Sequence, residues 1–98
     1  MKYQLELYEE SWEYVVSYQG LTLSLTIHHD LDEPHAPYDW GVSENRRGMG
    51  TPVWWTENAF SNHGDARADA RGWTLENVRD GRMPTANEAP RDASVDLG

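Results

Sequence analysis

The first third of the chain alternates apolar and polar side chains with a period of two, the pattern of a half-buried β-strand. The alternation covers residues 3–8, 12–18 and 21–28. Gln19 and Gly20 separate the last two of these segments, and glycine permits the positive φ that a tight hairpin turn requires. The three segments are therefore predicted to form consecutive strands of an antiparallel meander.

The alternation resumes over residues 38–44 and returns over residues 51–57, after a glycine-containing stretch at 45–50 that is typical of a hairpin loop. Proline lacks the amide hydrogen that a central strand donates, so Pro52 indicates either an edge strand or a strand that starts at the proline. Together with the first three segments, this predicts four or five strands.

Residues 65–80 are the one stretch with the spacing of an amphipathic helix. Its start would be capped by Asn62 or Gly64, and Gly81 would end it. Gly72 costs a helix about 1 kcal/mol relative to alanine, which leaves an alternative in which the helix breaks there and residues 73–78 form another strand. The positions that recur at helical spacing are Ala66, Ala70, Trp73 and either Asn77 or Val78.

These elements predict an α+β fold: an antiparallel sheet of four to five strands with one helix packed on one face, in the order β-β-β-β-β-α. Residues 1–82 are expected to form one domain, and the polar, proline-containing residues 83–98 a flexible tail. The predicted inner face carries Leu5, Leu7, Tyr14, Val16, Leu23, Leu25, Ile27, Trp40 and either Trp54 or Trp55. The predicted solvent face carries Gln4, Glu6, Tyr8, Glu13, Ser17, Thr22, Ser24, Thr26 and Asp39.

The net charge of −9 is concentrated in the N-terminal half of the chain. Residues 1–44 hold nine acidic side chains and one lysine, whereas residues 45–98 hold eight acidic side chains and seven arginines. Such a surface repels phosphate backbones, which disfavours direct binding of DNA or RNA, and attracts basic protein surfaces. There is no cysteine for a disulfide, and no apolar run for a signal peptide or a membrane helix, so an intracellular, cytoplasmic protein is expected.

The function that this pattern favours is non-catalytic binding to a basic, nucleic-acid-binding surface of a partner protein. An array of carboxylates imitates the phosphate spacing of a duplex. In size, charge and lack of catalytic motifs the chain is similar to some anti-CRISPR and anti-restriction proteins of phages and mobile elements. The residues expected to contact the partner are Glu6, Tyr8, Glu9, Glu10, Glu13, Asp30, Asp32, Glu33, Asp39 and Trp54.

The segment 27–39, IHHDLDEPHAPYD, holds three histidines and four acids and supports an alternative function. Imidazole and carboxylate groups are metal ligands, so a small metal- or ligand-dependent enzyme centred on residues 28–35 stays open. Two prolines mark this segment as a loop, and the adjacent His28 and His29 would point to opposite faces of a strand. We therefore predict a strand connection without a cofactor; a third alternative is a homo-oligomer, such as a homodimer, that pairs sheet edges.

Catalytic motifs do not support an enzyme. The chain has no Gly-x-Ser-x-Gly elbow and no glycine-rich phosphate loop.

The aromatic pair Trp54 and Trp55 is more informative, because adjacent residues of a strand face opposite ways. One indole is expected in the core and the other at the surface, where aromatic side chains are enriched in binding sites.

Overall fold

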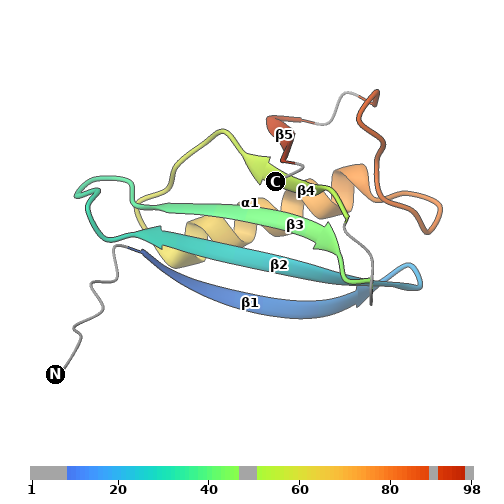
Figure 1. The fold of residues 1–98 in the computed structure, drawn as a ribbon, viewed down its shortest axis with the longest axis horizontal. Helices are drawn as coiled ribbons and strands as arrows, with labels where there is room; N and C mark the ends of the chain where they lie inside the picture. The colour runs from blue at the N-terminus through green and yellow to red at the C-terminus, as the bar shows by residue number, and fades with distance from the viewer. Residues whose placement is uncertain (1–8, 47–50, 89–90, 97–98) are drawn as a thin grey trace, which may run out of the picture.

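The structure is a computed structural model, and it describes residues 9–46, 51–88 and 91–96. These residues form one five-stranded antiparallel sheet and one helix, which confirms the α+β class (Figure 1). The elements are β1 (Glu9–Tyr18), β2 (Leu21–Asp30), β3 (Tyr38–Glu44), β4 (Val53–Thr56), α1 (His63–Asn77) and β5 (Ala93–Asp96).

The order of the elements differs from the prediction, because the fifth strand follows the helix. Strand β5 pairs with β4 and completes the sheet order β1-β2-β3-β4-β5. The predicted strand over residues 3–8 lies outside the described residues, and the prediction that residues 83–98 form a flexible tail is wrong for β5. Val95 lies opposite Trp54 in the ladder and packs against the core, so this short strand satisfies the outer backbone groups of β4 and adds apolar contacts.

The turn between β1 and β2 forms as the sequence predicts. Tyr18 pairs with Leu21, and the two loop residues Gln19 and Gly20 have φ values of 52° and 80°. Positive φ at both positions defines the type I′ hairpin, whose twist matches that of the flanking strands. Strand β4 begins at Val53, directly after the proline, so Pro52 removes no hydrogen bond from the ladder.

Helix α1 begins where the sequence indicates and passes through its internal glycine. The Asn62 side chain accepts a hydrogen bond of 2.8 Å from the Asp65 amide, which is the contact of an N-cap. The helix continues past Gly72 to Asn77, so the alternative in which residues 73–78 form a strand is wrong. The Trp73 side chain, next to Gly72, is fully buried. The free energy gained by burying it exceeds the cost of about 1 kcal/mol that glycine has relative to alanine in a helix.

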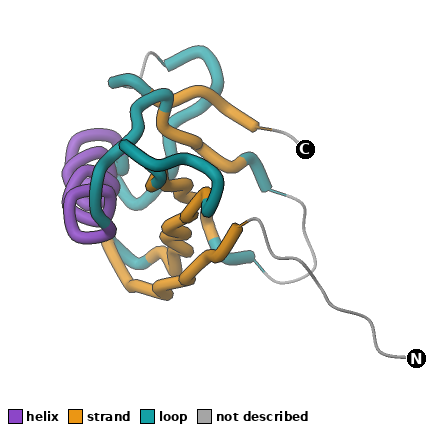
Figure 2. Tube along the Cα trace, turned by 90° about the vertical axis from the view of Figure 1, so that its left-hand side faces the viewer, coloured by secondary structure: helices purple, strands orange, loops and turns teal. Residues whose placement is uncertain are grey.

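The helix covers one face of the sheet (Figure 2), and it packs mainly against β2 and β3. The core between them confirms the inner positions predicted on these strands, and Trp54 is the inner member of the tryptophan pair. Two predicted positions differ: Val16 on β1 is exposed, and Ser24 on the opposite face is buried. The buried apolar residues are Leu23, Leu25, Ile27, Trp40, Val42, Trp54, Ala66, Ala70, Trp73 and Val78.

Candidate partner-binding site

The carboxylates predicted to contact a partner occupy two parts of the sheet. Glu6 and Tyr8 lie outside the described residues, and Glu9 is the first residue of β1. Four exposed side chains gather where β1 begins and β2 ends, and we call them the acidic end: Glu10, Asp30, Asp32 and Glu33. The register places Glu10 opposite His29 on the helix side of the sheet, whereas Asp30, the next residue of β2, faces the other side. Asp32 and Glu33 follow in the turn after β2.

Local hydrogen bonds connect residues within the loop of the acidic end. The Asp32 amide donates to Asp30 Oδ1 at 2.9 Å, and the His35 amide donates to Glu33 Oε1 at 3.0 Å. The Asp30 amide donates to the carbonyl of Pro37 at 2.8 Å, which closes the loop at its base. Carboxylates that are held before a partner arrives lose less conformational entropy on binding.

The acidic end carries no internal neutralisation among the described residues. The described arginines that form ion pairs do so in other parts of the molecule: Arg46 with Glu44 at 2.8 Å, Arg82 with Glu88 at 2.7 Å, and Arg91 with Glu76 at 3.1 Å. No described lysine or arginine forms an ion pair with the four carboxylates of the acidic end. Their negative potential therefore acts outward on whatever approaches this end of the sheet.

The two remaining predicted acids lie on the face of the sheet opposite the helix. Glu13 is exposed on β1, opposite Thr26. Asp39 lies opposite His28 on β2, and His28 Nδ1–H donates to Asp39 Oδ1 at 3.1 Å. Asp39 is thus engaged in a contact within the sheet, whereas Glu13 stands apart from the acidic end.

Trp54 does not belong to this surface, and its assignment as a contact residue is wrong. Only 3% of the residue is exposed, and its ring lies 5.8 Å from that of Trp73 in the core. The register sets this outcome, because Trp54 pairs with the inward-facing Val42. Its neighbour Trp55 pairs with Gly41 on the other face and is only partly buried, so Trp55 is the member of the tryptophan pair that a partner can reach.

The histidine segment separates its candidate ligands. His28 and His29 point to opposite faces of β2, and His35 lies exposed in the loop. No group of three histidine, aspartate or glutamate side chains with metal-binding geometry occurs within the described ranges. Within the described residues, the three histidines of this segment therefore do not belong to one metal-binding group.

His29 instead belongs to an aromatic cluster under the start of β1. Its ring stacks on Tyr38 with centroids 4.4 Å apart, and His63 stacks on Trp12 at 4.9 Å. His63 Nε2 also lies 3.2 Å from the Tyr14 hydroxyl. Sequence reasoning missed this cluster because it joins β1, β2, β3 and the first residue of α1, which lie far apart along the chain.

Comparison with protein-family models, with curated proteins and with solved structures finds no match for this chain. Among the described residues, no helix is long and apolar enough to cross a membrane.

Proposed function

We propose that this protein is a non-catalytic binding protein that uses its acidic end to occupy a basic surface of a partner protein. The observation that carries the proposal is the set of four exposed carboxylates without a basic partner among the described residues. A charge distribution of this kind speeds association with a surface of opposite sign and favours that surface over others.

The partner we propose normally holds nucleic acid on the same surface, so that this chain acts as an inhibitor by competition. Protein surfaces that bind duplexes carry arrays of lysine and arginine that neutralise phosphates. Two of the four carboxylates, those of Asp30 and Glu33, accept hydrogen bonds within the loop and therefore lose less conformational entropy when they meet such an array. Inhibitors of the anti-CRISPR and anti-restriction type are the setting in which this activity is expected.

The experiment is a capture of partner proteins on the immobilised protein, at about 0.05 M and about 0.5 M salt. We expect capture at the lower salt, loss at the higher salt, and release of the captured protein by added duplex DNA. The decisive variant combines Glu10→Gln, Asp32→Asn and Glu33→Gln, which removes three charges while it keeps the side-chain shapes. The rate of association with the partner should fall at least about tenfold at low salt, because the electrostatic attraction between the carboxylates and the basic surface is lost.

The control variant removes three exposed charges outside the acidic end: Glu57→Gln, Glu76→Gln and Asp80→Asn. It has the same net charge as the first variant, so a general effect of net charge would weaken both equally. Equal weakening, or capture that neither salt nor duplex DNA disturbs, would refute the proposal.

A further inference from the structure

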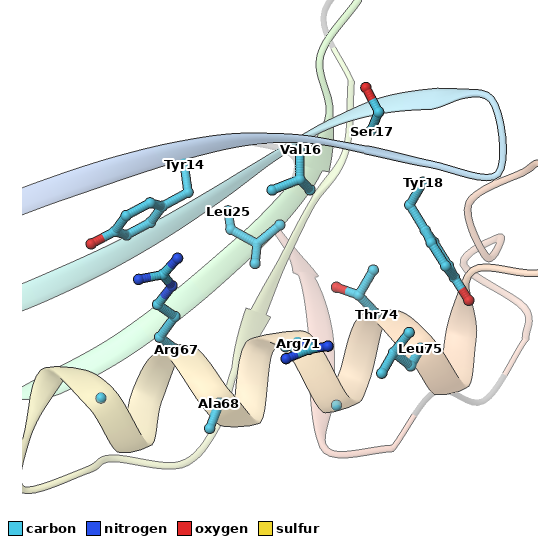
Figure 3. A pocket seen from close by; sticks show the side chains of 12 residues that line it. Tyr14, Val16, Ser17, Tyr18, Leu25, Arg67, Ala68, Arg71, Thr74 and Leu75 are labelled. Atoms are coloured by element: carbon cyan, nitrogen blue, oxygen red, sulfur yellow. The ribbon is translucent and has the colours of Figure 1, made fainter.

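A groove runs between strand β1 and helix α1, because the helix lies mainly over β2 and β3 and leaves the inner side of β1 exposed around Val16 (Figure 3). The groove has a volume of about 850 Å³. Val16 and Leu25 supply apolar surface from the sheet, and Leu75 supplies it from the helix. Tyr14 and Tyr18 stand on the β1 side, so this is an apolar surface with an aromatic border.

Two arginines line the helix side of the same groove. Arg67 and Arg71 are one helical turn apart, and neither forms an ion pair with a carboxylate within the described ranges. The Arg67 guanidinium carbon lies 4.1 Å from the centroid of the Tyr14 ring, a cation–π contact that directs the side chain across the groove. Arginines without a carboxylate partner among the described residues are notable in a chain whose net charge is −9. They give the groove the opposite charge to the acidic end.

The outer edge of β1 adds a third feature. This strand is ten residues long and is the last strand of the described sheet, so its outward N–H and C=O groups have no neighbouring strand there. Its Val15 is 56% exposed and its Val16 37% exposed, and Leu75 across the groove is 52% exposed. The glutamates of β1 lie in its N-terminal half, whereas the half around Val15 and Val16 carries no charge. Exposed apolar edges attract further strands, and proteins usually protect them when they are not used.

We propose that the β1 edge and the groove together bind an extended segment of a partner protein, which adds a sixth strand to the sheet. Addition of a strand to an exposed sheet edge is a general mode of peptide recognition, in which backbone hydrogen bonds supply affinity and pockets for alternate side chains supply specificity. Here the side chains on the helix side enter the groove, where Val16 and Leu75 contact apolar groups and the two arginines contact carboxylates.

The spacing of the arginines defines the partner sequence. Residues four apart on a helix are separated by about 6 Å along its axis. Side chains two apart on a strand point to one face and are separated by about 7 Å. Two acidic residues at alternate positions of the added strand therefore match Arg67 and Arg71. The partner segment is expected to carry the pattern acidic-x-acidic, with apolar side chains on the same face before and after it.

The test is a fluorescence anisotropy titration with the labelled peptide LTEVETLT, whose glutamates occupy alternate positions. The control peptide LTKVKTLT replaces them with lysine, and LTVEETLT moves one glutamate to the opposite face. We expect saturable binding of the first peptide and binding weaker by at least about tenfold for both controls, because each loses a charge-assisted contact with arginine.

Variants of the protein assign the binding to the groove. The double variant Arg67→Gln, Arg71→Gln should weaken binding of LTEVETLT by at least about tenfold. The charge-matched control Arg46→Gln, Arg79→Gln alters arginines outside the groove and should change binding by less than about twofold. Equal effects of the two double variants, or equal binding of the glutamate and lysine peptides, would overturn the proposal.

Hydrogen exchange of the unaltered protein tests the pairing itself. In a type I′ hairpin the residues that close the turn bond to each other, so on β1 the amides of Glu13, Val15 and Ser17 point to the outer edge. Saturating peptide should slow exchange at these three amides and leave Tyr14 and Val16 little changed. Exchange that stays fast at the three outward amides would show that no strand is added.

Two further outcomes separate this proposal from its competitors. If the three outward amides become protected as the protein concentration alone rises, together with a dimer in sedimentation, the occupant is a second copy of this chain and the proposal fails. The variant Glu10→Gln, Asp32→Asn, Glu33→Gln should bind the peptide at least as well as the unaltered protein. Peptide binding that disappears in this variant would mean that the acidic end, and not the groove, holds the peptide.

Discussion

The buried indole of Trp40 donates a hydrogen bond from Nε1 to Asp69 Oδ2 at 2.9 Å, which ties the centre of the sheet to helix α1. Trp40 is fully buried, so its N–H has no access to water. The other oxygen of Asp69 lies 3.4 Å from Arg91, just before β5. One carboxylate of the helix thus connects β3 with the C-terminal segment.

Replacement of Asp69 by alanine should lower the free energy of unfolding by about 1–3 kcal/mol, because it leaves a buried donor without an acceptor. The measurement is urea unfolding followed by tryptophan fluorescence. Asp69→Asn keeps an oxygen acceptor and should lose less stability than Asp69→Ala. Equal losses in the two variants would indicate that charge, and not the hydrogen bond to Trp40, carries the effect.

The C-terminal segment should be required for full stability. Val95→Asp places a charge against the core beside Trp54, and we expect it to lower the free energy of unfolding by about 1–3 kcal/mol. For a domain of this size each kcal/mol corresponds to about 4–8 °C in the melting temperature. Calorimetry measures the change, and Ser94→Asp on the exposed position of the same strand is the control. An unchanged melting temperature for Val95→Asp would show that β5 does not support the core.

The close approach of Trp55 to Gly41 should make this glycine irreplaceable. A Cβ atom at Gly41 would lie 2.8 Å from Cε3 of the Trp55 ring. Gly41→Ala is therefore expected to lower the free energy of unfolding by about 1–3 kcal/mol, the range found when extra volume is forced into a well-packed site.

The matched control is Gly72→Ala, where an added Cβ would meet no atom closer than Arg91 at 4.0 Å. Because alanine has the higher helix propensity, this change should stabilise the protein by about 0.5–1 kcal/mol. Combining Gly41→Ala with Trp55→Ala should cost less than the two single changes added together. Simple additivity would contradict the proposed contact.

Glu88 should titrate far below an ordinary glutamate. A hydrogen bond from Arg82 at 2.7 Å and one from the Thr85 amide at 3.0 Å lower the pKa of Glu88 to about 2. Because the pKa is lower in the folded state, the contribution to stability is complete above the unfolded value of 4.5 and is lost as the pH falls towards 2. The pair is exposed to solvent, so salt should reduce the effect.

An NMR titration of the Glu88 carboxyl carbon measures this directly. Arg82→Gln should return the pKa of Glu88 most of the way towards its ordinary value, since the hydrogen bond from Arg82 is the largest cause of the shift. A titration midpoint that is ordinary in the unaltered protein would contradict the contact between these two side chains.

The sequence predicted those features that depend only on residues close together along the chain. The period-two alternation identified β2 and β3 because their inner side chains, from Leu23 to Val42, face a helix along most of their length. Asn62 marked the start of α1 because a cap needs only the amide three residues later. The charge asymmetry identified the acidic end, since Asp30, Asp32 and Glu33 are close together along the chain.

Other features depend on contacts between residues far apart in the sequence, and only the tertiary structure determined them. Strand β5 has only four residues and too little apolar character to be recognised alone; it forms because β4 offers it a template. Adjacent tryptophans must face opposite ways, but only the pairing with Val42 puts Trp54 inside. The lateral position of α1 over β2 and β3 opens the groove beside β1, and no periodicity within a single element encodes where a helix sits across a sheet.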